Sequence, residues 1–358
     1  MRTKSLIQEE VYTKLLEVFD GIAGERGYEF VEPTPLVSPF WNSTFTPSSS
    51  EIIFRHLNGG ASPQSASACQ PCIRINDLPR LGDGWHLLLF HMISFIRFDL
   101  QGYADEINAL LIAMSSALGC KPSDLFYTVS TTPVLGRGTS PPTLGADLLL
   151  ELGVPESNII FCRGTANYQN ALLTTAERCN VAMIGPKIEV YVHGSDEVLR
   201  EVGTFEIAAA RIGKSSERNV FAFVVGLERM AGAAEGKTHL ARLPKHERTI
   251  TKLCRSLLHP SMGQTNIGFD ALAQVVLILD ALAHIGLMLP NQETARNRGL
   301  VNHYRRVTRE LIRILKGTGI PYERFADVFA KEFTGEVRHF LPEEIVLKHL
   351  DDSSEYIG

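Results

Sequence analysis

The 358-residue sequence has few cysteines and no long apolar run. Its six cysteines include one close pair, Cys69 and Cys72, so they form no pattern typical of a disulfide framework or a paired zinc ribbon. That pair offers at most half of a zinc site, and two buried thiols are the simpler interpretation. No stretch approaches the roughly 20 apolar residues that a membrane-spanning helix needs. Charges interrupt the first 19 residues, so we expect no signal peptide and a cytoplasmic protein.

A strong net charge is also lacking. The formal charge is -5, with a pI near 6.1, so any contact with nucleic acid must come from a local basic patch. The 44% hydrophobic content suits a large core, and the length predicts about two domains. After residue 240 the sequence changes to helical patterns with basic faces, which predicts domains at 1–240 and 241–358.

Residues 69–92 have the pattern of a strand, a polar turn and a second strand. Arg74 leaves the first strand, and His86 and Phe90 are expected on the second. An arginine can hold a phosphate in a forked hydrogen bond while an aromatic ring stacks on a base, which would suit a nucleoside triphosphate. From these residues alone, a plain hairpin with one surface arginine and one core phenylalanine is the simpler interpretation.

Two further charged residues stand in apolar surroundings. Glu189 lies on an expected strand and must be paired, exposed or functional. Arg229 lies where an expected strand from Val220 to Gly226 meets a helix, and either an anion or a nearby carboxylate would offset its burial. Helical periodicity predicts a helix over 104–118 and others over 245–258, 271–287 and 300–316, whereas residues 57–68 are expected to be mobile.

Several of these segments resemble the signature motifs of class II aminoacyl-tRNA synthetases, and of alanyl-tRNA synthetases in particular. The similar segments are QPCIRINDL and HLLLFHM, then GPKIEV, and finally GLER, and they occur in the family's order. The resemblance implies that Arg74 binds the α-phosphate of ATP, that Phe90 stacks on adenine, and that His86 lies nearby. It also implies a γ-phosphate contact from Arg229 after Gly226, and a place for Glu189 beside ATP and Mg²⁺. Arg74 and Arg229 would be the catalytic residues, and Thr204 would lie beside the amino acid.

The resemblance continues into the last third of the chain. Residues 280–320 are similar to the helical domain with which alanyl enzymes grip the tRNA acceptor stem. It implies phosphate contacts from four arginines: Arg296, Arg298, Arg305 and Arg309. A basic helix face is also typical of ordinary solvated surface, and that alternative stays open. The family's editing and C-terminal domains have no counterpart in these 358 residues, as expected of a truncated paralogue.

Five departures from the family affect the implied active site. Ala222 stands where the family has the aspartate that binds the substrate's ammonium, and the family's pocket tryptophan has no counterpart. Lys187 replaces a cysteine, and Trp85 and His91 replace an arginine and a glutamate. Glu206 would restore the missing charge if its side chain turned inward. We therefore expect the activated acid to differ from alanine.

These observations predict an α+β fold, with a class II synthetase-like antiparallel sheet flanked by helices and followed by an α-helical domain. The predicted function is ATP-dependent activation of a carboxylic or amino acid to an acyl adenylate, with transfer to a tRNA 3′ end or to a small-molecule amine in biosynthesis. ATP and Mg²⁺ are the implied cofactors. The alternative is a non-catalytic paralogue that binds tRNA or a partner protein. No oligomeric state follows from the sequence.

Overall fold

A computed structural model describes residues 10–37, 44–49, 53, 64–130, 144–163, 167–174, 180–212, 218–257, 268–288 and 298–332. The chain forms two compact units. Unit 1 contains residues 1–72 and 90–238, and unit 2 contains residues 73–89 and 239–358. The segment 73–89 thus groups with the later helices, and the domain boundary at residue 240 stays a prediction. Within the described ranges, no helix is long and apolar enough to cross a membrane.

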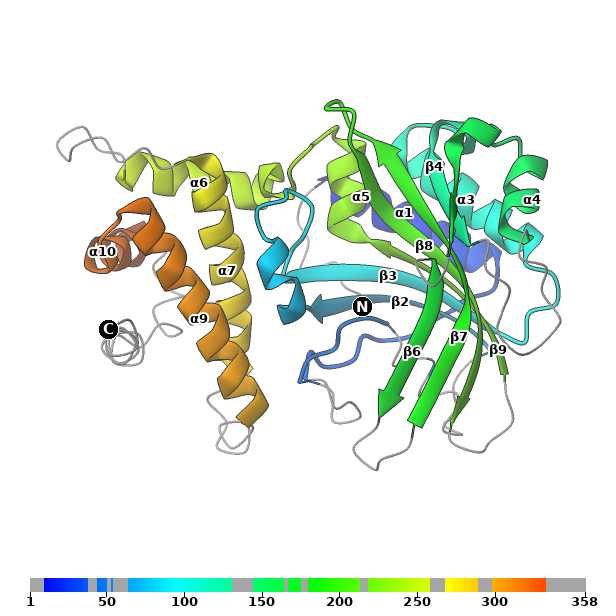
Figure 1. Ribbon diagram of the computed structural model, residues 1–358, viewed down its shortest axis with the longest axis horizontal. Coiled ribbons are helices and arrows are strands. Elements are labelled where there is room, and N and C mark those ends of the chain that lie inside the picture. The colour runs from blue at the N-terminus through cyan, green and yellow to red at the C-terminus, as the bar shows by residue number, and fades with distance from the viewer. Residues whose placement is uncertain are drawn as a thin grey trace. The chain divides into compact units, whose positions relative to one another are not determined.

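One sheet dominates unit 1 (Figure 1). Among the described residues it has nine strands, in the order β1-β2-β3-β9-β8-β7-β4-β5, with β6 beside β7. The pairs β1–β2 and β4–β5 are parallel, and β9 pairs antiparallel with β3 and β8, as does β7 with β8, β4 and β6. The strands are β1 (Glu29–Phe30), β2 (Ser65–Ile73), β3 (Leu89–Phe98), β4 (Phe126–Ser130), β5 (Ile159–Cys162), β6 (Tyr168–Thr174), β7 (Asn180–His193), β8 (Leu199–Ile212) and β9 (Arg218–Gly226).

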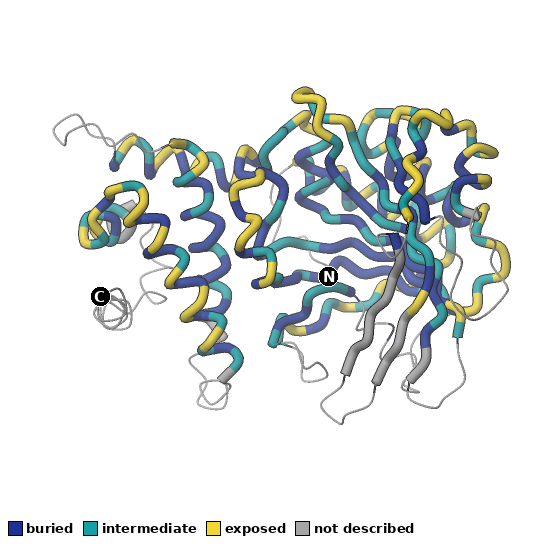
Figure 2. The backbone as a smooth tube through the Cα atoms, viewed as in Figure 1, coloured by how far each residue is buried: buried dark blue, intermediate teal, exposed yellow. Residues whose placement is uncertain are grey.

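In the described part of unit 1, four α-helices lie on one face of this sheet: α1 (Glu10–Glu25), α3 (Ala104–Leu118), α4 (Leu144–Glu151) and α5 (Leu227–Ala234). Aromatic rings fill the space between them and the strands. The ring of Phe19 on α1 lies 5.9 Å from that of Phe95 and 6.4 Å from that of Phe223, while Phe205 and Phe223 stack at 4.4 Å. Successive side chains of a strand point to opposite faces, so Phe221, Phe223 and Val225 belong to the helix-covered face. Figure 2 shows the central strands as largely buried.

Several predicted elements coincide closely with observed ones, but two predictions were wrong. The helix over 104–118 and the strand ending at Gly226 are confirmed. Residues 65–68, which were expected to be mobile, belong to β2, because small side chains such as Ala66 and Ala68 fit a buried strand with neighbours on both sides. His86 is not on a strand, since β3 begins at Leu89.

Unit 2 is helical. It contains η1 (Ile75–Arg80), η4 (Leu240–Arg242), α6 (Pro244–Leu257), α7 (Phe269–Met288), α9 (Arg298–Thr318) and α10 (Tyr322–Glu332). The apolar α7 packs against α6 and α9, and α9 also contacts η1. On α9 the predicted apolar stripe is buried, and it consists of Tyr304, Val307, Leu311 and Leu315. The predicted α+β architecture, an antiparallel sheet flanked by helices and accompanied by a helical domain, is therefore confirmed.

Candidate functional site

The register of unit 1 places five residues in one row across adjacent strands. The residues are direct Cα partners in the order Thr128, Glu189, Thr204, Val224 and Ser94, on β4, β7, β8, β9 and β3. Direct partners share a face of the sheet. The neighbours of Val224 on β9, Phe223 and Val225, belong to the helix-covered face, so this row lies on the opposite face. We call that face the open face because the described α-helices of unit 1 lie on the other one, although Ser94, Ile96 and Ala222 on it are buried.

The next row on the open face carries the residues of the implied substrate pocket. Lys187, Glu206, Ala222 and Ile96 are direct partners on β7, β8, β9 and β3. Glu206 therefore lies beside Ala222 on the same face, where a carboxylate would have to lie to replace the missing aspartate. Ala222 itself is only 2% exposed. It belongs to an apolar cluster made of Ile53, Ala66, Ala68, Ile96, Phe98, Ala208, Ala210, Val220 and Ala222.

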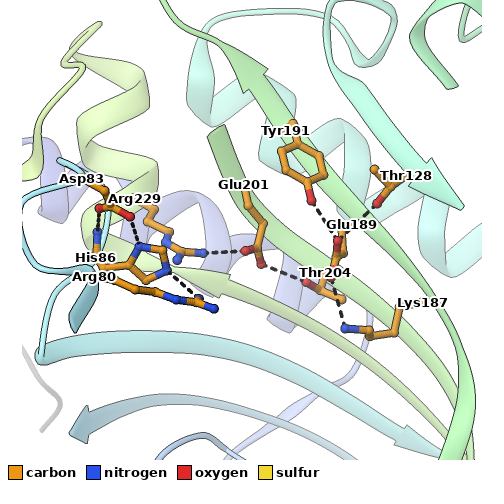
Figure 3. Close-up of polar contacts among 10 residues, drawn as sticks. All are labelled: Arg80, Asp83, His86, Thr128, Lys187, Glu189, Tyr191, Glu201, Thr204 and Arg229. Carbon is orange, nitrogen blue, oxygen red and sulfur yellow. Dashed lines mark hydrogen bonds and ion pairs between the residues drawn. The ribbon is translucent and has the colours of Figure 1, made fainter. Parts of the chain in front are cut away.

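Glu189 accepts hydrogen bonds from three side chains (Figure 3). Its Oε1 lies 3.1 Å from Lys187 Nζ, and its Oε2 lies 2.8 Å from the Tyr191 hydroxyl and 3.3 Å from Thr128 Oγ1. Burial, aided by the hydrogen bond to Glu189, raises the pKa of Tyr191, so this hydroxyl remains a donor at neutral pH. The carboxylate is thus paired and only partly exposed.

This donor set does not fit a magnesium ion on Glu189. Magnesium needs bare oxygens at about 2.0–2.1 Å, and an ammonium already contacts Oε1. Within the described residues, no group of three or more His, Cys, Asp or Glu side chains is placed to hold a metal. The same holds for the cysteine pair: Cys69 and Cys72 are buried, and burial raises the pKa of the Cys69 thiol to about 12, which opposes the thiolate that zinc requires.

Arg229 pairs with a carboxylate of the neighbouring strand. Its Nη1 lies 2.9 Å from Glu201 Oε2, and Thr204 Oγ1 donates to Glu201 Oε1 at 3.3 Å (Figure 3). The carboxylate partner left open by the sequence is therefore present. Gly226 makes room for this arginine, because a Cβ at that position would lie 3.3 Å from Arg229 Cδ. Glu201 and Thr204 are on β8, so the contact brings Arg229 to the strand that carries Thr204 and Glu206.

The remaining residues that the resemblance assigned to a nucleotide belong to different units. Arg74 and His86 belong to unit 2, and Phe90 belongs to unit 1, where strand alternation puts it on the open face with Ser94. His86 Nδ1 lies 2.5 Å from Asp83 Oδ2. Asp83 is 44% exposed; its remaining burial would raise the pKa of its carboxyl, but the hydrogen bonds from the Trp85 N–H and from His86 outweigh that effect and lower the pKa. Asp83 therefore fixes the turn that contains His86, which precedes β3 in the sequence.

The predicted RNA contacts are placed in part. Arg296 lies outside the described residues, and Arg298 is the first residue of α9. Arg305 and Arg309 are exposed on α9, and Arg309 Nε donates to the Arg305 carbonyl. Arg313, which shares their spacing, is instead paired with Glu310 at 2.6 Å. The exposed basic face therefore includes Arg305 and Arg309.

Sequence reasoning missed Thr128, Tyr191 and Glu201, and it noted Lys187 only as a departure from the family. Tyr191 and Lys187 flank Glu189 at two-residue spacing, so strand periodicity alone would have placed all three on one face. Glu201 gave no such signal, because its contact with Arg229 spans 28 positions of the chain. His91, noted as a departure, lies on the helix-covered face, where its Nδ1 is 2.8 Å from Glu228 Oε1.

Comparisons with known proteins give a likeness in structure only. No protein-family model and no curated protein matches the sequence. Apo histidyl-tRNA synthetase of S. aureus is similar over 71% of this chain and 78% of that one, with 12% identity and a TM-score of 0.45. The RNA-binding domain of threonyl-tRNA synthetase from Cryptosporidium parvum Iowa II follows at 14% identity, covering 68% and 73%, with a TM-score of 0.44. Asparaginyl-tRNA synthetase of Entamoeba histolytica has 10% identity, 66% and 65% coverage, and a TM-score of 0.40.

Proposed function

We propose that this protein is a class II aminoacyl-tRNA synthetase-like ligase of the cytoplasm. In this proposal it activates a carboxylic or amino acid with ATP and passes the acyl group to a tRNA 3′ end or to a small amine. The observation that carries the proposal is the open face itself. Its register brings together Glu189, Thr204 and Ala222, three positions that the synthetase resemblance had assigned one by one to the nucleotide and the acid, and it sets Glu206 beside Ala222.

The chemistry requires little more than positioning. An oxygen of the acid's carboxylate forms a bond to the α-phosphorus of ATP, and the bond from that phosphorus to pyrophosphate breaks. No general base is needed, because the carboxylate is already deprotonated and nucleophilic. Negative charge develops on the phosphate oxygens, and a guanidinium is well suited to stabilise it. Arg229 has this role in the proposal, and the role of Arg74, in unit 2, rests on the sequence resemblance.

The identity of the acid is the second part of the proposal. Ala222 is enclosed by apolar side chains and offers no charge to an ammonium group. An acid that lacks a free α-ammonium, or that is larger than alanine, suits such a surface better. Glu206 is the residue that would reverse this preference, because it is the direct partner of Ala222.

The experiment is ATP–pyrophosphate exchange with a panel of carboxylic acids. Labelled pyrophosphate should enter ATP only in the presence of the correct acid, and Arg229→Ala should reduce the exchange rate. Arg218→Ala is the matched control: Arg218 is the first residue of β9 and, like Arg229, it pairs with a carboxylate, that of Asp99. If no acid supports exchange and the protein does not bind ATP, the proposal is refuted.

One observation favours a second candidate, a non-catalytic paralogue that binds tRNA or a partner protein. Two charged side chains assigned to ATP, Glu189 and Arg229, already pair within the chain. Binding of tRNA at low salt without ATP binding would identify that function.

A further inference from the structure

The ion pair between Lys187 and Glu189 occupies the place that the family resemblance assigns to a metal site. The two residues are separated by one position on β7 and therefore point to the same face. Lys187 Nζ lies 3.1 Å from Glu189 Oε1, and the side chains are 19% and 18% exposed. A pair this sheltered is screened less by water and salt than a fully exposed one.

The other oxygen of Glu189 is held as well. Tyr191 and Thr128 both donate to Oε2, and Thr128 Oγ1 in turn accepts from Asn167 Nδ2 at 2.7 Å. A divalent cation on Glu189 would have to displace a fixed ammonium and would be repelled by it. Glu201 on β8 offers no alternative, because it is paired with Arg229.

We propose that Lys187 takes the place of a carboxylate-bound metal on the open face; this inference rests on the proposed function. Glu189 orients Lys187, and the ammonium meets the phosphates of the nucleotide directly. Lysine suits this role because it has three N–H donors, of which Glu189 engages one, and because it binds phosphate as a point charge. Glu189 is then a positioning residue, and ATP binding does not require a divalent ion on this carboxylate.

The test measures ATP affinity in excess Mg²⁺ and in EDTA. Wild-type affinity should change by less than about threefold between the two conditions. Lys187→Met should weaken binding in EDTA by about tenfold or more, which matches the loss of one charge-assisted contact. Lys187→Arg retains a cation and should stay within about threefold of the wild type. Lys245→Met is the matched control: it breaks a lysine–carboxylate pair of similar length, 3.0 Å to Asp280, in unit 2.

A second readout uses the metal alone. Mn²⁺ binding to the nucleotide-free protein is followed by electron paramagnetic resonance. The wild type and Glu189→Gln should bind the same number of Mn²⁺ ions. A Mn²⁺ site lost in Glu189→Gln would overturn the inference, and so would a wild-type ATP affinity that falls tenfold or more in EDTA. Either result would leave the proposed function standing. Absence of ATP binding in both conditions would instead overturn the proposed function, and the inference with it. Circular dichroism of each variant establishes that the fold is retained.

Discussion

Replacing Arg229 by alanine should weaken ATP binding by about 10- to 150-fold. A charge-assisted hydrogen bond contributes about 1.5–3 kcal/mol, and each 1.4 kcal/mol corresponds to tenfold in affinity. The guanidinium is 21% exposed and is oriented by Glu201 at 2.9 Å, so little of its contribution should be lost to solvent or to side-chain freedom. The same range is expected for Arg74→Ala in unit 2.

Stability separates this effect from unfolding. The partner carboxylate, Glu201, is 37% exposed, and an ion pair this accessible contributes about 0–1 kcal/mol to stability. Arg229→Ala should therefore fold normally and lose affinity far more than stability. Arg229→Lys keeps the charge but loses the forked geometry, and should fall between the wild type and the alanine variant.

Isothermal titration of ATP against each variant measures the affinity, and urea denaturation measures the stability. Arg218→Ala, which breaks the pair with Asp99, should leave ATP affinity unchanged. Unchanged affinity in both Arg229→Ala and Arg74→Ala would refute the synthetase-type site. A loss of affinity that tracks a loss of stability would refute the direct contact.

Three further predictions follow from other parts of the molecule. Replacing Arg305 and Arg309 by glutamine should weaken tRNA binding and reduce the slope of its salt dependence by about one unit per lost contact. Arg313→Gln should have less effect, because Arg313 is paired with Glu310. A wild type that binds no tRNA at low salt would contradict the prediction. L-Alanine should be a poor substrate in pyrophosphate exchange, by about 10²–10³-fold, because Ala222 supplies no charge to its ammonium. Efficient exchange, with Glu206 supplying that charge instead, would disprove this prediction. The Arg200 guanidinium lowers the pKa of Asp196 to about 2, below its ordinary value, so this carboxylate stabilises the fold above about pH 4 and ceases to do so as the pH falls toward 2. Asp196→Asn should remove that part of the acid dependence in urea denaturation measured from pH 5 to 2, and an unchanged pH profile would exclude it.

The sequence by itself determined the elements whose pattern is complete within one segment. The helix at 104–118 and the apolar stripe of α9 repeat at helical spacing, and the strand ending at Gly226 alternates. The burial of such a segment depends mainly on its own periodicity, so local reasoning is sufficient. The order of the motifs also predicted the candidate site positions on β7, β8 and β9.

Only the tertiary structure decided which partner each charged residue meets. Arg229 faces Glu201 across 28 positions, and Glu189 meets Thr128 across 61. Such pairs follow from the register between strands distant in sequence, which no single segment encodes. The same reason explains why residues 65–68 became a buried strand and why Ala222 lies in an apolar cluster: their neighbours come from β3, β8 and β9. Lys187, by contrast, meets Glu189 through the two-residue periodicity of β7 itself, which the sequence already contained.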